Sequence, residues 1–418
     1  MERRDFHFPL VVLLALVSSS AQGAPILEVC STCAYRTIHA AIEAAPIGAT
    51  VKIGAGEYRE GPLVVTRSLT LEPLDPATPP ILDGQGKDEI LKIKAPNVTV
   101  RGLHFRSSGY RSTLDLAAIR IENVEGCLVS DNEIENAAFG IYLAKVKRCT
   151  ILHNRIHSTG RDTSDTGSGI HIWSAEAIEI ISNEISGHRD GIYFEFVEES
   201  RIIDNHSHDN QRYGLHFMFS HGDLYQGNRF VNNESGVAVM YSRRMTMLAN
   251  RFERSHGPAA YGLLLKDITD SAIQGNLFGD NTTGMYIEDG SRVRIIENDF
   301  ERNGWAVRLI GSSEKNQFEH NNFLANTFEV AALPGSARNR FDSNYWSQYE
   351  GLDLNHDGFG DIPYHPVRLS AIWMQGVEGA SFLMGSLFMV FVDRAEALLP
   401  AITPETVIDA RPLIQRRP

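Results

Sequence analysis

Two histidines and two methionines in the middle of the chain have the chemistry to bind a soft metal ion. His216 and Met218 lie two residues apart in the stretch YGLHFMFSHGD, and Met240 follows 22 residues after Met218. His171 lies in a similar stretch, GIHIW. Thioether sulfur and imidazole nitrogen suit copper(I), and neither needs a lowered pKa to bind it. These four residues are the candidate copper site if the fold brings them together.

The first residues have the features of a secretory signal. Arg3 and Arg4 precede the short apolar run PLVVLLALV, and the small residues of SSSAQGA indicate cleavage near Gly23. The apolar run is too short to span a membrane, and no lipid-attachment box precedes Cys30. We therefore expect that residues 1–23 are removed and that the protein is periplasmic, with no transmembrane helix of its own.

Four cysteines enter this oxidising compartment. Cys30 and Cys33 form a C-x-x-C, for which two interpretations stay open: a short disulfide, as export favours, or a thiolate pair for copper(I). Cys127 and Cys149 are 22 residues apart. We expect these two to stack as a buried cysteine ladder rather than to act as a functional pair, because free cysteine is commonly buried.

A second metal chemistry is suggested near the C-terminus by the stretch DLNHDGFGD. Asp353, Asn355 and Asp357 alternate along it, Gly358 permits a sharp turn, and Asp361 could complete a cage of oxygen ligands. This is the first half of an EF-hand-type loop without its distal glutamate. It predicts a structural calcium site, with an Asx-rich turn as the alternative.

A repeat in the sequence determines how these residues are arranged in space. In one repeating frame, asparagine opens an N-x-[I/F/W] pattern at nine positions, and Asn205 fits the same frame without the apolar third residue. The ten positions are Asn132, Asn154, Asn183, Asn205, Asn228, Asn250, Asn276, Asn298, Asn321 and Asn344. Most gaps are 22 or 23 residues, which indicates a solenoid. Each asparagine is expected at a corner, in the left-handed region and stacked on its neighbours.

Glycine followed by alternating residues gives a second landmark in each repeat, as in GIYLA, GIHIW, GIYFE, GLHFM and GVAVM. The residues one and three after glycine are apolar, which is typical of a strand with one buried face. Together with a third strand per repeat, this pattern predicts an all-β, right-handed parallel β-helix of about 22–23 residues per coil. Because coils lie about 4.8 Å apart, Met218 and Met240 should be neighbours on the outward side, with His216 beside Met218. His171 should lie two coils from His216.

The ends of the solenoid differ from its repeats. The stretch YRTIHAAIEAAP predicts a helix that caps the N-terminal end. We expect the β-helix to occupy residues 24–368 and to include the calcium-like loop at 353–361. Residues 369–418 form an apolar, helical tail, which either caps the C-terminal end or docks another protein.

The outward side of the glycine-led strands leaves three functions open. Aromatic rings there could stack on a polysaccharide, methionine and histidine could bind copper(I), and both residue types favour a protein interface. A polysaccharide-cleaving or polysaccharide-modifying enzyme needs catalytic groups in addition to aromatic rings. Glu195 and Glu288 lie about four coils, roughly 19 Å, apart, which is too distant for a glycosidase pair. The net charge of −13 argues against a nucleic-acid partner.

The ordered set of these motifs resembles the NosD family. The resemblance rests on IHAAIEAAPIGATVKI, the coils GIHIW, GLHFM and VAVMYS, the stretch NYWSQYEGLDLNHDGFGDIPY and the ending VIDARPLI. Family membership implies a periplasmic β-helix protein that is an accessory factor rather than an enzyme, and that supports maturation of nitrous oxide reductase. It also implies three partners: the membrane subunit of an ABC transporter, a copper chaperone lipoprotein and the reductase itself. The cargo would be copper, or a sulfur species, for a copper-sulfide centre.

Overall fold

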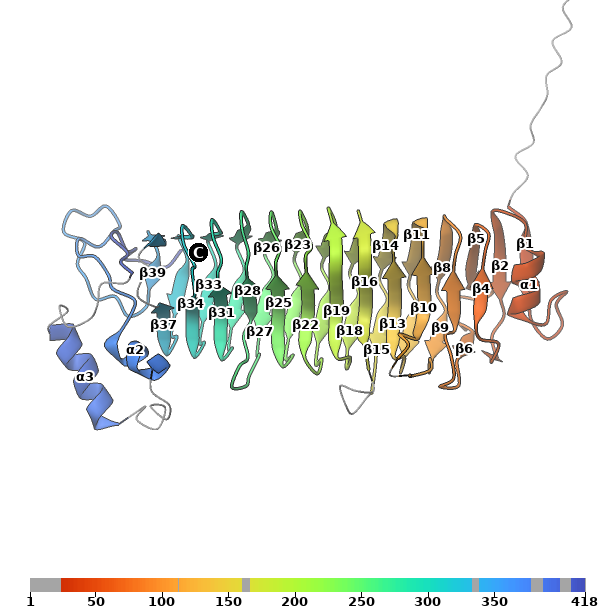
Figure 1. The fold of residues 1–418 in the computed structure, drawn as a ribbon, viewed down its shortest axis with the longest axis horizontal. Helices are drawn as coiled ribbons and strands as arrows, with labels where there is room; N and C mark the ends of the chain where they lie inside the picture. The colour runs from red at the N-terminus through yellow and green to blue at the C-terminus, as the bar shows by residue number, and fades with distance from the viewer. Residues whose placement is uncertain are drawn as a thin grey trace, which may run out of the picture.

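The fold is a parallel β-helix, as the repeat predicts. The computed structural model describes residues 24–111, 113–159, 166–332, 338–376, 386–398 and 407–417. The expected signal segment therefore lies outside the described residues. Figure 1 shows an elongated stack of coils with helices at both ends. Each complete coil contributes one strand to each of three faces, and the strands of successive coils pair in parallel.

We call the first of these the glycine face, because glycine opens its central strands. Its strands are β4 (Leu63–Val65), β7 (Leu91–Ile93), β10 (Ala117–Glu122), β13 (Phe139–Ala144), β16 (Ser168–Glu176), β19 (Asp190–Glu198), β22 (Tyr213–Met218), β25 (Ser235–Met240), β28 (Leu263–Lys266), β31 (Thr283–Glu288), β34 (Trp305–Ile310) and β37 (Phe328–Ala332). The glycines are needed where neighbouring backbones approach closely. A Cβ added at Gly214 would lie 2.9 Å from the carbonyl oxygen of Gly236 in the next coil.

The second face follows the glycine face in each coil and belongs to the same 26-stranded sheet. Its strands are β1 (Ile26–Val29), β2 (Ala49–Ile53), β5 (Leu69–Pro73), β8 (Val98–Arg101), β11 (Glu125–Ser130), β14 (Lys147–Leu152), β17 (Glu179–Ile181), β20 (Arg201–Ile203), β23 (Leu224–Gln226), β26 (Thr246–Leu248), β29 (Ala272–Gln274), β32 (Arg294–Ile296), β35 (Gln317–Glu319) and β38 (Arg340–Asp342).

The third face is a separate 13-stranded sheet. Its strands are β3 (Glu57–Tyr58), β6 (Ile81–Asp83), β9 (His104–Arg106), β12 (Glu133–Glu135), β15 (Arg155–His157), β18 (Glu184–Ser186), β21 (His206–His208), β24 (Arg229–Val231), β27 (Arg251–Glu253), β30 (Leu277–Gly279), β33 (Asp299–Glu301), β36 (Asn322–Leu324) and β39 (Tyr345–Trp346). The residue two positions after each repeat asparagine is buried inside the solenoid, and it is apolar in every repeat except that of Asn205, where it is Ser207. From Phe230 to Trp346 these rings stack on one another inside the solenoid.

The ten repeat asparagines form a continuous buried ladder between the second and third faces. Each side-chain amide donates to the Oδ1 of the next asparagine over 2.9 to 3.0 Å. The expected stacking is therefore confirmed, but the expected left-handed backbone is wrong for the asparagines themselves. The residue immediately before each one has the positive φ instead: Asp131, His153, Ser182, Asp204, Gly227, Ala249, Gly275, Glu297, His320 and Ser343. The asparagine is thereby free to extend and to point its side chain inward.

Three helices lie at the ends of the solenoid. Helix α1 (Ile38–Ala44) covers the N-terminal end, as predicted, and Thr37 Oγ1 caps it by accepting from the Ala40 N–H at 3.3 Å. Helices α2 (Leu369–Gly376) and α3 (Leu387–Leu398) lie at the other end (Figure 1). Within the described residues, neither they nor α1 combine the length and apolar character needed to cross a bilayer.

The C-terminal segment closes the asparagine ladder. Asp409 is fully buried, and its Oδ2 accepts from the side chains of Asn344 and Trp346 at 3.0 Å each. The chain then runs back along the third face, where Arg416 Nη2 lies 3.0 Å from Glu301 Oε1. The Asp409 side chain thus takes the position in the ladder that the next asparagine would have occupied.

Candidate functional site

The outward side of the glycine face brings the two methionines together. Met218 and Met240 are direct register partners on the adjacent strands β22 and β25, and both are half-buried. His216 is two residues before Met218 on the same side, with Ala238 opposite it in the next coil. Glu195 precedes Met218 in its column, and Lys266 follows Met240. His216, Met218 and Met240 therefore lie next to one another on the glycine face, as predicted.

His216 is more enclosed than an outward position suggests, with only 7% of its surface exposed. Its ring lies 5.2 Å from the Tyr193 ring and 4.9 Å from the Tyr213 ring, centroid to centroid. Its Nδ1 is 3.4 Å from Nη2 of Arg212, and its buried Nε2 has no hydrogen-bond partner. Burial lowers the pKa of His216 to about 4, although the Asp190 carboxylate acts in the opposite direction. The imidazole is consequently neutral at neutral pH, with one ring nitrogen unused.

His171 does not join the other three residues. It lies two coils away, as predicted, but its ring is stacked between Tyr142 at 4.5 Å and Tyr193 at 4.8 Å. Tyr193 therefore separates His171 from His216 in this column. Burial, with smaller contributions from Arg189 and Arg120, lowers the pKa of His171 to about 3.

An exposed aromatic stack borders the methionine pair. Phe196 lies within β19, and Phe219 and Tyr241 directly follow β22 and β25. The three side chains occupy corresponding corner positions of the glycine face, and their rings stack at 5.3 and 5.0 Å. Each is at least 39% exposed and each has a positive φ near +50°. The corner requires this left-handed conformation in neighbouring coils too, where Asp267 occupies it. Bulky aromatic residues are poorly suited to the conformation.

His221 lies beyond β22, in an isolated bridge rather than in the strand. Together with Phe196 and Phe219 it lines a surface hollow that extends toward Lys145 and Lys147. This hollow lies beside the aromatic corner and not over the methionine pair.

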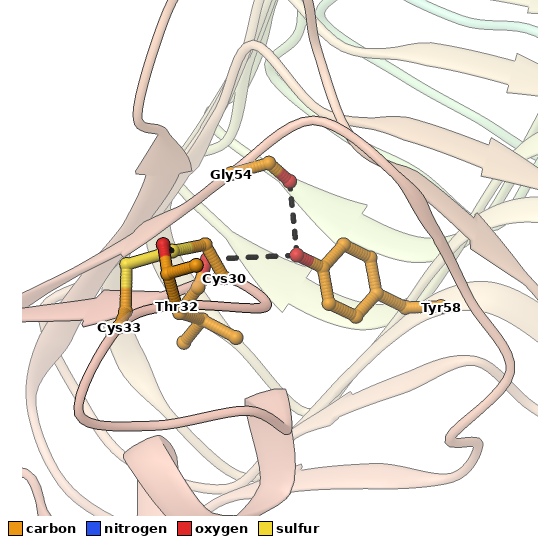
Figure 2. Close-up of a disulfide and its surroundings, with 6 residues drawn as sticks. Cys30, Thr32, Cys33, Gly54 and Tyr58 are labelled. Carbon is orange, nitrogen blue, oxygen red and sulfur yellow. Dashed lines mark hydrogen bonds between the residues drawn. A yellow bond between two sulfur atoms is a disulfide. The ribbon is translucent and has the colours of Figure 1, made fainter.

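The two cysteine pairs are both oxidised. Cys30 and Cys33 form a disulfide with a Cα–Cα distance of 4.9 Å, next to Tyr58, whose hydroxyl donates to the Gly54 carbonyl (Figure 2). Thiolate ligation of copper(I) by this pair would require its reduction. Cys127 and Cys149 are register partners, as predicted, but they are bonded to each other rather than stacked as free thiols.

The calcium-like loop has the geometry of an Asx-rich turn. Asp353 Oδ2 accepts from the Gly358 N–H at 2.9 Å, and Asp357 Oδ1 accepts from the Phe359 N–H at 2.9 Å. Asp361 Oδ2 accepts from the Leu354 N–H at 2.6 Å. The side chain of Asn355 likewise turns inward, to the Asp357 N–H at 3.1 Å. These oxygens bind backbone donors, and they would have to turn toward an ion to form the predicted cage.

A further cluster of ligand-type side chains lies on the third face, where the sequence patterns gave no expectation. It consists of Glu184, His206 and His208, whose ligand atoms lie within 4.8 Å of one another. The sequence signal is the H-x-H of His206–His208, because alternate residues of a strand share a face.

Comparison with known proteins links this architecture to one family. A family model described as "Periplasmic copper-binding protein (NosD)" matches residues 153–351. A Pseudomonas aeruginosa protein described as "Probable ABC transporter binding protein NosD" is 29% identical over 396 residues, with 87% of each chain covered. A Stutzerimonas stutzeri protein with the same description is 28% identical over 385 residues and covers 87% of this chain and 86% of its own.

Solved structures share the fold at low sequence identity. The surface adhesin PfbA of Streptococcus pneumoniae superposes with a TM-score of 0.53 at 12% identity, covering 74% of this chain and 87% of the adhesin. The A-module of the Azotobacter vinelandii mannuronan C-5 epimerase AlgE6 gives 0.53 at 14% identity, with 75% and 95% covered. These proteins show that the solenoid is a β-helix, and the identities are too low for more.

Proposed function

The chain belongs to the NosD family, and from this premise we propose that it is a periplasmic copper-binding protein that carries copper(I) on its glycine face. The observation that carries the proposal is the direct register pairing of Met218 with Met240, beside a neutral His216. Two thioethers and one imidazole are a soft ligand set suited to copper(I). The cargo would be passed on for the copper-sulfide centre of nitrous oxide reductase.

The residues present fit a copper(I) cargo in two respects. The Nε2 atom of His216 is buried without a hydrogen-bond partner, which costs free energy unless something else occupies the nitrogen. The Met218 and Met240 side chains are half-buried on the outward side of the glycine face, so neither is enclosed in the core. His171 is not part of this proposed ligand set, because the Tyr193 ring separates it from His216.

A copper(I) titration tests the proposal. The exported chain would be titrated in competition with a chromophoric copper(I) chelator, alongside a variant carrying Met218→Leu, Met240→Leu and His216→Gln. We expect at least about a hundredfold loss of affinity, equivalent to about 2.7 kcal/mol. Met285→Leu is the matched control, since Met285 is fully buried in the same face. Equal affinity of the triple variant and the unaltered chain would refute the site.

Copper must also reach this site from a donor, and the aromatic corner is suited to receive one. We propose that a copper chaperone docks on Phe196, Phe219 and Tyr241. Phe219 and Tyr241 directly follow Met218 and Met240 in the sequence, so a partner seated on the rings would lie beside the ligands. The strained backbone at these corners also supports a functional reason for keeping aromatic residues there.

We assign contact with the membrane partner to helix α3, at the C-terminal end of the solenoid. Leu387, Phe388 and Phe391 are 89%, 50% and 72% exposed, an apolar surface that a monomer in water would not favour. We infer that this surface docks the membrane subunit of an ABC transporter. The descriptions of both relatives as ABC transporter binding proteins support that assignment.

A further inference from the structure

The third face carries a group of metal-ligating side chains that the proposed copper(I) site does not use. Glu184 of β18 and His206 of β21 are register partners on adjacent coils, and His208 shares the outward side with His206. One ligand atom from each of the three lies within 4.8 Å of the others, and no other such group of His, Cys, Asp and Glu occurs in the described part of the chain.

The orientation of His208 is fixed by a neighbouring carboxylate. Its Nδ1 lies 2.6 Å from Asp209 Oδ2, so the ring donates its Nδ1 proton and presents the Nε2 lone pair. That Nε2 atom is buried, lies 3.5 Å from Glu184 Oε1 and has no hydrogen-bond partner. A carboxylate behind one ring nitrogen, with the other nitrogen free, is the arrangement that holds histidine ligands in metal sites.

The other two residues complete a compact group. Glu184 Oε2 accepts from Arg155 Nε at 3.2 Å, which leaves Oε1 directed toward the histidines. The His206 ring stacks on the His208 ring at a centroid distance of 4.3 Å. Glu184 and His206 are both half-exposed, so the group remains open to solvent on one side.

We propose that Glu184, His206 and His208 form a second metal site, for a divalent transition-metal ion of the zinc(II) or copper(II) type. Two imidazoles and one carboxylate are a harder ligand set than paired thioethers, and they leave a coordination position for water. Asp209 acts as a positioning residue, through its hydrogen bond to His208. The two metal sites therefore differ in ligand chemistry and lie on different faces of the solenoid.

Zinc(II) binding by the chelator-treated exported chain tests this inference directly. A competition titration with a chromophoric zinc chelator should give one site that His206→Gln with His208→Gln weakens at least about a hundredfold. Asp209→Asn should weaken it about tenfold or more while all three ligands remain. Copper(II) binding, followed by electron paramagnetic resonance, should show nitrogen coupling that the same double variant loses.

His104→Gln is the matched control. His104 lies on the same face with Nε2 3.2 Å from Glu135 Oε2, a histidine–carboxylate contact without a second imidazole. We expect it to leave metal binding unchanged, and unchanged melting temperatures would show that every variant is folded. No stoichiometric binding of either ion, or equal binding by the double variant, would overturn the inference. Copper(I) binding at the methionine pair would be unaffected by these outcomes.

Discussion

At the scale of single residues, burial decides which groups can hold a metal and which cannot ionise. His216 and His171 are kept neutral by burial, and the pKa of each lies far below its ordinary value. Asp223 shows the opposite case. Its carboxyl is almost fully buried at a corner of the solenoid, where its Oδ1 accepts from the Ser200 N–H at 2.8 Å. Burial raises the pKa of Asp223 to about 8.

Asp223 gives a prediction for stability against pH. In the unfolded chain this carboxyl loses its proton near pH 3.8, whereas in the folded protein it keeps it until about pH 8. The unfolded state therefore binds fewer protons in this window, and stability falls as pH rises from about 4 to 8. Asp223→Asn should remove this contribution and be more stable than the unaltered protein at pH 8, by at least about 1 kcal/mol. Denaturant unfolding at several pH values measures it, and parallel curves for the two proteins would contradict it.

At the scale of elements, the sequence pattern specified the strands but not the side-chain contacts between them. The period-two alternation and the 22-residue frame predicted the register of Met218 with Met240 correctly. The left-handed corner residue was misplaced by one position, because asparagine tolerates that conformation and its buried hydrogen bonds cannot be inferred from spacing alone. The enclosure of His216 by Tyr213 and Arg212 depends on rotamers, which the repeat does not encode.

The third-face histidines were missed for a related reason. The clearest sequence pattern lies in the glycine-led strands, whereas His206 and His208 lie in a strand whose repeat lacks the usual apolar residue. Their partner Glu184 is 22 residues away from His206 and becomes a neighbour only through the stacking of coils.

The aromatic corner carries an element-scale prediction. Phe219→Asn with Tyr241→Asn replaces strained aromatic residues by one that tolerates positive φ, so stability should change by less than about 1 kcal/mol. Copper(I) affinity should also persist, whereas the rate of copper transfer from a loaded chaperone should fall about tenfold or more. Stopped-flow transfer measurements test this. Asp267→Asn, at the same corner one coil further, is the control. If this control transferred copper as slowly as the double variant, the docking assignment would be contradicted.

The calcium-like loop gives a second prediction at this scale. The loop holds the C-terminal segment, since the Gly360 N–H donates to the Pro412 carbonyl at 2.8 Å. If calcium binds, a concentration of one hundred times its Kd should stabilise the protein by about 2.7 kcal/mol. Asp353→Asn with Asp357→Asn should abolish the shift in melting temperature, and magnesium should not reproduce it. An unchanged melting temperature in millimolar calcium would leave the loop as an Asx-rich turn.

At the scale of the whole molecule, both open ends of the solenoid are covered. Helix α1 covers the first coils, and Asp409 terminates the asparagine ladder at the last one. The solenoid is elongated, so the two functions proposed above would be separated along its length (Figure 1). Strands β22 and β25, which carry the methionine pair, lie near its middle, and helix α3 lies at its C-terminal end (Figure 1).

This separation predicts that docking and copper binding can be altered independently. Leu387→Ser, Phe388→Ser and Phe391→Ser together should abolish co-purification with the transporter membrane subunit while leaving copper(I) affinity unchanged. Ile47→Ser is the control, because Ile47 is 77% exposed at the opposite end of the rod. Undiminished co-purification of the triple variant would contradict the assignment of α3.

Met218 and Met240 are proposed to bind copper(I) through sulfur. X-ray absorption at the copper edge of the copper(I)-loaded protein measures this directly, because sulfur and nitrogen ligands scatter differently. We predict two sulfur scatterers and one nitrogen scatterer, with the sulfur contribution lost in Met218→Leu with Met240→Leu and kept in Met285→Leu. A spectrum with only nitrogen or oxygen ligands, or one unchanged by the double substitution, would contradict the account.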